Sequence, residues 1–368
     1  MTKKDANAVK TNALLERFKK TSSLKFTQEL DDSDVLVNPE FTDTHIPALN
    51  VLFSGRLDGG FTSGVSVFQG ESKTGKTVWS LVCAKAYMDK YPDSVLLYYD
   101  SELGASKRYF SSLGIETSRV LHIPVTTVEE LKIDLVKQLE GIELGDHVII
   151  VLDSLGNLAS RKEINDAMTD KDTADMSRAK SVKSLFRMIG CKLGLKRIPM
   201  IVVNHTYSTM EMFSKEVGSS GRGLVYVSQN IYTITKSQEK KGTDVVGYNF
   251  NLNVTKSRFS REKTRIPITM TFDGGIKKWS GLLDMALLSG DIVKPSNGWY
   301  SIVDTETGTV EEKRYRESET DNAEFWTPIL ERPHFRKWVE DTYSIANKPL
   351  MVESDDTKLP DAEIRVTD

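Results

Sequence analysis

An eight-residue stretch, Gly70 to Thr77 with the sequence GESKTGKT, constrains this chain more than any other feature. It fits G-x-x-x-x-G-K-[ST], a loop whose backbone N–H groups surround the phosphates of a nucleotide. The apolar run 65–68 precedes it, and residues 78–91 follow it with the spacing of a helix. A strand, a glycine-rich turn and a helix in this order are the setting that such a loop requires. The octet therefore predicts a nucleotide-binding α/β protein.

The residue types within the octet suit phosphate chemistry. Gly70 and Gly75 allow backbone conformations that side chains disfavour, so that successive N–H groups can point at phosphate oxygens. The dipole of the following helix adds attraction for an anion. Lys76 is expected at the β- and γ-phosphates of ATP, and the Thr77 hydroxyl at Mg²⁺. The expected nucleotide site is completed by Glu71, Ser72, Lys73 and Thr74.

Composition places the chain among ordinary soluble globular proteins, with 39% hydrophobic and 27% charged residues. Because the formal net charge is −3, contact with nucleic acid would need a local basic surface. No apolar signal peptide opens the chain and no stretch approaches ~18 apolar residues, so we expect a cytoplasmic protein without a membrane span. Cys83 and Cys191 are expected to be buried packing residues in helices, as in a reducing compartment.

Alternating apolar and helical patterns predict a doubly wound α/β sheet. Helical patterns occupy 128–144 and 176–193. The first four candidate strands are nearly unbroken runs of Val, Ile and Leu, as in parallel strands that are covered on both faces. Segments 248–257 and 265–272 alternate, which predicts an antiparallel hairpin at the sheet edge. The candidate strands are 65–68, 95–99, 148–152, 200–203, 231–234 and 248–254.

Changes in composition divide the chain into four expected parts. Residues 1–45 hold a basic amphipathic helix and a linker, and residues 46–283 form the ATPase core. Residues 284–345 are expected to form a small α+β subdomain, which includes a strand at 299–302. The tail, 346–368, carries six acidic and three basic residues and is expected to be disordered.

Polar residues follow three of the expected strands, where open α/β sheets bind their ligands. Asp153 ends an apolar run and is expected in the Mg²⁺ shell. Asp100 and Glu102 both qualify as the carboxylate that polarises the attacking water, and strand parity puts both on the same side. His205 is equally consistent with a sensor of the γ-phosphate and with a structural hydrogen bond.

Two long segments leave these strand ends, and long connections are usually functional or disordered. The second, 207–229, combines glycines, cations and large apolar residues, which suits contact with a single nucleic-acid strand. The first, 157–178, mixes both signs of charge, which by itself indicates a solvated surface. The side chains considered for DNA contact are Arg161, Lys162, Arg178, Met212, Phe213, Lys215 and Arg222.

Several further stretches resemble the RecA-type recombinase family, in particular its UvsX strand-exchange branch in T4-like phages. They run from residue 21 to about residue 300 and include YYDSELG, LDSLGNLASRKE, DMSRAKSVKSLFR, VNHTYSTMEMFSK and FDGGIKKWSGLLDMAL. The resemblance implies a RecA-like P-loop NTPase core with a mostly parallel twisted sheet. It also implies an ATPase that is dependent on single-stranded DNA, forms helical filaments and exchanges strands with homologous double-stranded DNA. Recombination, repair and recombination-dependent replication would be its settings.

The resemblance also assigns residues at the nucleotide. It implies that Glu102, in place of Asp100, is the catalytic carboxylate, and that Tyr109 lies against the adenine. Asp153 would serve the Mg²⁺ shell, and His205 occupies the position of a RecA glutamine that couples the nucleotide to a DNA-binding loop.

Other implied roles concern assembly. Segments 157–178 and 206–229 would be the two DNA-binding loops. Lys256 and Arg258 would reach the ATP of a neighbouring subunit, against which the N-terminal helix and residues 22–26 would also pack. Single-strand-binding and mediator proteins are the other expected partners. Two alternatives stay open: a RecA-fold ring helicase or translocase, and a non-enzymatic DNA-binding module for which ATP is only a structural ligand.

Overall fold

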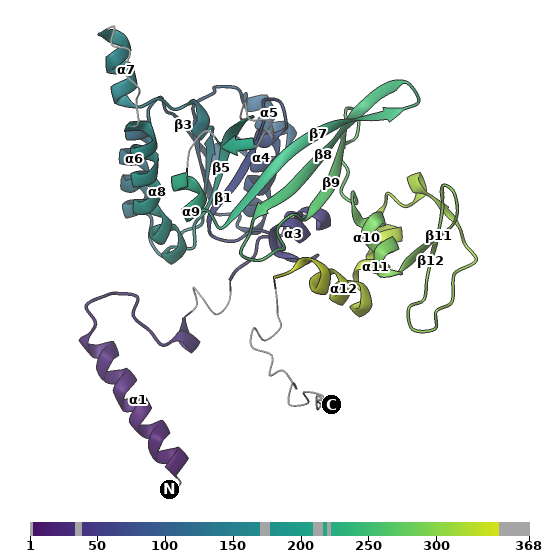
Figure 1. Ribbon diagram of the computed structural model, residues 1–368, viewed down its shortest axis with the longest axis horizontal. Coiled ribbons are helices and arrows are strands. Elements are labelled where there is room, and N and C mark those ends of the chain that lie inside the picture. The colour runs from purple at the N-terminus through teal and green to yellow at the C-terminus, as the bar shows by residue number, and fades with distance from the viewer. Residues whose placement is uncertain (1–2, 34–38, 170–176, 209–215, 219–221, 346–368) are drawn as a thin grey trace, which may run out of the picture.

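The computed structural model describes residues 3–33, 39–169, 177–208, 216–218 and 222–345. Within these ranges a ten-stranded sheet forms the centre of the molecule, and a three-stranded sheet lies in the C-terminal part. Helices cover both faces of the large sheet (Figure 1). The predicted α/β class is therefore confirmed.

Six neighbouring strands of the large sheet are parallel. Their order is β3-β2-β4-β5-β1-β7, and each is paired in register with the next. Asp100 lies opposite Asp153, and Gly70 lies opposite His205, so the carboxyl ends of four strands meet at one edge. The strands are β1 (Gly64–Gly70), β2 (Val95–Asp100), β3 (Val120–Pro124), β4 (Val148–Asp153), β5 (Pro199–Ser208) and β7 (Asn230–Lys241).

The sheet continues beyond β7 with antiparallel strands, which confirms the predicted edge hairpin. The long β7 and β8 project together beyond the rest of the sheet (Figure 1). The short β3 was not predicted, because it is an edge strand with mostly exposed or half-buried residues and shows no apolar run. The added strands are β8 (Asp244–Lys256), β9 (Arg265–Thr271), β10 (Gly275–Ile276) and β6 (Glu216–Gly218), which pairs with β5.

Two apolar cores lie on the two faces of the sheet. Phe68 of β1 packs in the core that contains α3 (Pro47–Ser54) and α4 (Lys76–Lys90). Val65 and Val67 of the same strand point to the opposite core, as strand alternation requires. The second core is covered by α6 (Val128–Gly141), α8 (Ser177–Leu195) and α9 (Arg222–Val227).

The two cysteines differ from expectation. Cys83 is buried in α4, as predicted, but Cys191 is exposed, so its predicted burial is wrong. Ile189 and Leu193 carry the apolar stripe of α8 toward the sheet. Cys191 lies midway between them in sequence, about half a helical turn from each, and therefore faces outward.

The remaining elements flank the core. The N-terminal helix α1 (Lys3–Thr21) stands apart from it (Figure 1). The expected disorder of 346–368 lies outside the described residues. No described helix is both long and apolar enough to cross a membrane. The other helices are α5 (Lys107–Ser112), α7 (Arg161–Met168), α10 (Leu282–Ser289), α11 (Ala323–Leu330) and α12 (Pro333–Tyr343), with short 3-10 turns at Leu30–Asp32, Thr117–Arg119, Leu155–Asn157 and Glu317–Glu319. The small sheet consists of β11 (Ile292–Ser296), β12 (Trp299–Ile302) and β13 (Tyr315–Arg316).

Candidate functional site

The octet forms a tight loop between β1 and α4. Gly75 precedes α4 with φ 80°, and a Cβ there would approach the Phe250 ring to 2.7 Å. A Cβ on Gly70 would come within 2.5 Å of the Ile234 carbonyl oxygen. Both positions thus require glycine. No side chain caps the first turn of α4, so its backbone N–H groups present a positive helix end at the loop.

Lys76 lies within this loop. Its buried ammonium group donates to the carbonyl oxygens of Gly70 at 3.0 Å and Glu71 at 2.6 Å. Burial lowers the pKa of Lys76, while the negative charges of Glu102 and Asp153 oppose that change. The ammonium group therefore belongs to the same electrostatic unit as the two strand-end acids.

Asp153 lies at the end of β4, and one of its two carboxylate oxygens has no hydrogen-bond partner among the described residues. The Thr77 hydroxyl donates to its Oδ2 at 2.7 Å and the Tyr98 hydroxyl at 3.1 Å. Its Oδ1 is buried and has no hydrogen-bond partner among the described residues. Burial raises the pKa of Asp153, and the hydrogen bond from Thr77 opposes this.

An unpaired buried carboxylate oxygen beside a threonine hydroxyl fits a hard divalent cation, which prefers oxygen ligands. The described residues contain no group of three or more metal-binding His, Cys, Asp or Glu side chains. One hydroxyl and one carboxylate suit Mg²⁺, because this ion takes few ligands from protein and keeps others from phosphate and water.

Glu102 and Asp100 have different surroundings, although both follow β2. Asp100 is 2% exposed, and its Oδ1 accepts hydrogen bonds from the backbone N–H groups of Glu102 at 3.0 Å and Leu103 at 2.7 Å. It therefore shapes the turn, in which Leu103 has φ 54°. This geometry favours Glu102, whose side chain leaves the turn, as the reactive carboxylate.

A single oxygen of Glu102 receives two side-chain contacts. The Ser154 hydroxyl donates to Oε1 at 2.6 Å, and His205 Nε2 lies 2.8 Å from the same atom. The hydrogen bond with His205 is the main cause that lowers the pKa of Glu102 to about 2. The structure thus brings His205 to Glu102. Sequence reasoning did not single out Ser154, although its position directly after Asp153 was a usable signal.

Tyr109 lies on α5, half-buried against the core beside β2. Burial raises the pKa of its hydroxyl, and the negative charge of Asp153 contributes. Tyr109 is thus on the same side of the sheet as the loop.

Lys256 and Arg258 are far from this group. Lys256 pairs with Ile231 at the start of β7, which places both basic residues at the amino edge of the parallel strands. The Lys256 ammonium donates to the carbonyl oxygens of Val225 at 2.6 Å and Ser228 at 2.7 Å, at the end of α9. Burial, and then the charge of Arg258, lowers the pKa of Lys256. The Arg258 side chain is exposed.

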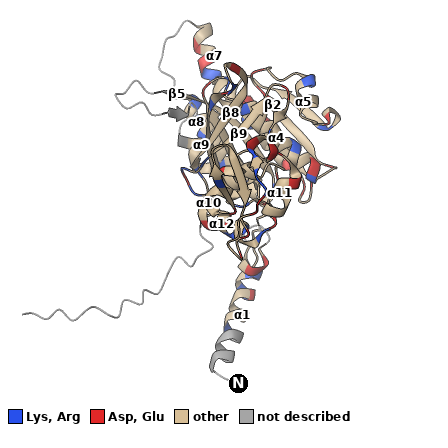
Figure 2. Ribbon diagram, turned by 90° about the vertical axis from the view of Figure 1, so that its right-hand side faces the viewer, with Lys and Arg blue, Asp and Glu red and all other residues tan. Residues whose placement is uncertain are grey.

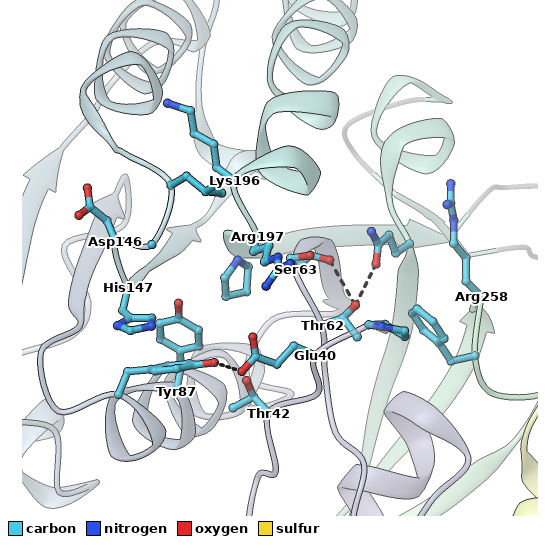
Figure 3. Close-up of a pocket in the computed structure, with 17 residues that line it drawn as sticks. Glu40, Thr42, Thr62, Ser63, Tyr87, Asp146, His147, Lys196, Arg197 and Arg258 are labelled. Carbon is cyan, nitrogen blue, oxygen red and sulfur yellow. Dashed lines mark hydrogen bonds between the residues drawn. The ribbon is translucent and has the colours of Figure 1, made fainter. Parts of the chain in front are cut away.

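A pocket of about 470 Å³ adjoins Arg258 at this amino edge. Figure 3 shows it between the linker before α3 and the core, with Glu40 and Arg197 reaching in from different elements. Lys90 contacts Glu40 at 2.9 Å, and the Thr62 hydroxyl donates to Gln229 at 3.0 Å. Its lining comes from distant parts of the chain, so sequence reasoning did not find it.

The residues considered for DNA contact lie in several settings. Arg161 and Lys162 begin α7, which carries both signs of charge (Figure 2), and Lys162 pairs with Asp166 at 2.5 Å. Arg178 lies on α8, where its guanidinium donates to the carbonyl oxygens of Leu158, Leu155 and Gly156. Arg222 begins α9. Met212, Phe213 and Lys215 lie outside the described residues.

Comparison with known proteins extends over most of the chain. Residues 44–277 match the family model of the RecA N-terminal domain. The chain belongs to the RecA family. Residues 279–339 match a second model, described as the C-terminal domain of the bacteriophage T4 recombination and repair protein. The predicted RecA-like fold is thereby confirmed.

Individual members of the RecA family show the same relationship. The chain is 45% identical over 336 residues to the Recombination and repair protein of Enterobacteria phage T4, which covers 90% of this chain and 86% of that protein. It is 28% identical over 281 residues to Protein RecA of Clostridioides difficile, with 74% and 77% covered. The implied membership of the phage branch is confirmed as well.

Proposed function

We propose that this chain is an ATP-dependent DNA recombinase that assembles as a helical filament on single-stranded DNA and exchanges it with a homologous duplex. One observation carries the proposal. The phosphate loop and Glu102 lie at the carboxyl edge of the sheet, whereas Lys256 and Arg258 lie at its amino edge. Head-to-tail stacking would join these two half-sites around one ATP. The 45% identity to a recombination and repair protein supports this reading.

Such stacking is a heterologous contact, because two different edges of the same chain meet. A heterologous contact that does not close into a ring produces an open helix. ATP in the junction would contact both protomers and so favour the assembled state, and loss of the γ-phosphate would weaken it. The nucleotide would therefore control how firmly the filament holds DNA.

Within one half-site, each residue has a physical task. Lys76 and the N–H groups of α4 would bind the phosphates, and Tyr109 would lie against the adenine. Thr77 and Asp153 would hold Mg²⁺, which supplies positive charge to the β- and γ-phosphate oxygens. Because the pKa of Glu102 is about 2, this carboxylate is ionised at neutral pH and would orient and polarise the water without holding its proton.

His205 would connect the nucleotide to DNA. It touches Glu102, and the next residue, Thr206, pairs with Gly218 of β6. Segments 157–178 and 206–229, which we propose as the DNA-binding loops, both leave the carboxyl edge. Their cationic groups would hold the phosphate backbone, while base pairing would supply the sequence information.

The proposed setting follows from the same role. We place the protein in the cytoplasm of a host cell, where it would act with single-strand-binding and mediator proteins in recombination, repair and replication. A ring helicase is the less favoured alternative, because residues 279–339 also match a recombination and repair protein outside the ATPase core.

The proposal is tested by ATP turnover with and without single-stranded DNA, followed by electron microscopy with a slowly hydrolysed ATP analogue. We expect turnover to rise with DNA and open helical filaments to form. Turnover that ignores DNA would contradict the proposal. Closed rings that unwind a forked duplex without a homologous strand would favour the helicase.

Replacing Lys256 and Arg258 with alanine should lower DNA-dependent hydrolysis by about 10²–10³-fold, because cations that face the phosphates across the junction are lost. ATP binding by the separate protomer should persist, since neither residue contacts the phosphate loop of its own chain. Fluorescent-nucleotide titration and a phosphate-release assay measure the two effects.

A matched control is the pair Lys240→Ala and Lys241→Ala at the outer end of the β7–β8 hairpin. This control also removes two positive charges, but from the end of β7 that lies farthest from Lys256 and Arg258. Full activity of the Lys256→Ala/Arg258→Ala variant would rule out a half-site shared across the junction.

A further inference from the structure

A buried serine separates the two basic residues of the amino edge. Ser257 is 9% exposed, whereas the Arg258 side chain is exposed and Lys256 is half-buried. The two basic side chains that we propose contact the neighbour's ATP therefore flank a residue whose own side chain is buried. The contacts of Ser257 therefore help to determine the position of the Arg258 backbone.

The Ser257 hydroxyl makes three hydrogen bonds. It donates to Asn230 Oδ1 at 2.8 Å, and it accepts the backbone N–H groups of Phe259 at 3.1 Å and Ser260 at 3.0 Å. The two accepted bonds close the turn immediately after Arg258. One hydroxyl group therefore ties the chain on both sides of Arg258.

Asn230 in turn belongs to the centre of the sheet. It begins β7 and is 1% exposed, and it pairs with Ser66 of β1, to whose hydroxyl its Nδ2 donates at 3.3 Å. The other end of β1 carries the phosphate loop. The turn is thus fixed to the strand that carries the same protomer's own nucleotide half-site.

Other contacts hold the turn from outside. The Ser260 hydroxyl donates to the Leu52 carbonyl oxygen at 2.6 Å, and the Phe259 ring packs edge-on against Phe41, with centroids 5.5 Å apart. Arg261 N–H donates to the Tyr343 carbonyl oxygen at 2.7 Å. The Ile345 N–H also donates to the Phe259 carbonyl oxygen at 2.8 Å, so the Ser257 hydroxyl shares the anchoring of the backbone next to Arg258 with this bond and is the side-chain group among these anchors that binds it.

We propose that Ser257 is a positioning residue that sets the Arg258 backbone for contact with the neighbour's ATP. The inference rests on the proposed function. A misplacement of about 1 Å at a catalytic group costs on the order of 10²-fold in rate, so a hydroxyl that fixes this turn controls hydrolysis without touching ATP. Substitution of Ser257 would therefore slow hydrolysis at the nucleotide site of the neighbouring protomer and not at the nucleotide site of its own protomer.

The test uses full-length Ser257→Ala. We expect DNA-dependent hydrolysis to fall about 10- to 100-fold, with ATP binding by the protomer unchanged. Ser257→Thr, which keeps the hydroxyl, should restore most of the rate. Ser301→Ala is the matched control, because Ser301 is also buried but its hydroxyl has no partner among the described residues. Thermal melting checks that the variants fold.

Mixing separates a role across the junction from a local defect. Glu102→Gln protomers are expected to hydrolyse ATP at least about 10²-fold more slowly, but they carry an intact turn. In an equal mixture, about half of the Ser257→Ala half-sites face an intact turn, since neighbours in a head-to-tail chain are drawn at random. We therefore expect the mixture to exceed the sum of the separate rates. No gain on mixing, or wild-type hydrolysis by Ser257→Ala, would overturn the inference.

The same mixture made with Lys256→Ala/Arg258→Ala protomers tests the underlying proposal separately. If that variant is inactive alone and gains activity on mixing, the shared half-site stands, and a failure of Ser257→Ala then concerns Ser257 only. If that variant does not gain activity, the proposed function itself fails.

Discussion

Replacing Glu102 with glutamine is expected to slow ATP hydrolysis by about 10²–10⁴-fold while ATP binding and assembly on single-stranded DNA persist. Glutamine keeps the size of the side chain and can still accept the hydrogen bond from Ser154. It removes the negative charge that would polarise the attacking water. The variant should therefore accumulate in ATP-bound filaments.

Single-turnover phosphate release and electron microscopy measure these two properties. Glu143→Gln, an exposed glutamate on the loop after α6, is a control for the loss of one charge. Asp100→Asn serves as a second comparison, because Asp100 accepts hydrogen bonds from the backbone of the turn that carries Glu102. Normal hydrolysis by Glu102→Gln together with a loss in Asp100→Asn would assign the reaction to Asp100.

Lys76→Ala should abolish ATP binding and all assembly that depends on ATP. The ammonium group is the one cation of the octet that is buried within the loop, and there it lies in the field of Glu102 and Asp153. Removing it leaves the β- and γ-phosphates without their main compensating charge. Fluorescent-nucleotide titration and filament counts in electron micrographs should both fall to background.

Lys85→Ala is the matched control, since Lys85 lies on the same helix and its ammonium group forms a surface ion pair with Asp89, away from the loop. Because Lys76 also donates to two loop carbonyl groups, thermal melting should accompany the binding assay. If Lys76→Ala forms filaments at the ATP concentrations at which the wild-type protein does, the octet is not the nucleotide site.

Local sequence patterns were enough for the phosphate loop, for the strand exits and for the helices α1, α4, α6 and α8, whereas α3, α5, α7, α9, α11 and α12 were not predicted. A buried parallel strand needs a continuous apolar run, and a loop of this kind needs glycine and lysine at fixed spacing, so both leave a local record. The strand Trp299–Ile302 occurs at the predicted residues. The edge strand β3 left no such record, because its residues are only half covered.

Tertiary structure decided what local spacing leaves open. The alternation of side chains along a strand places Asp100 and Glu102 on the same side. Only the folded turn shows that Asp100 is buried and binds the turn's backbone, whereas the Glu102 side chain leaves the turn. The outward position of Cys191 follows from which face of α8 meets the sheet.

The separation of the nucleotide site from Lys256 and Arg258 depends on strand order and direction. Lys256 ends β8, which runs antiparallel to β7 and so returns to the amino edge, and Arg258 lies two residues beyond it. Hydrogen bonds such as those of Ser257 with Asn230 join residues that are distant in sequence. Such contacts exist only after packing brings the strands together, whereas the elements themselves are specified by neighbouring residues.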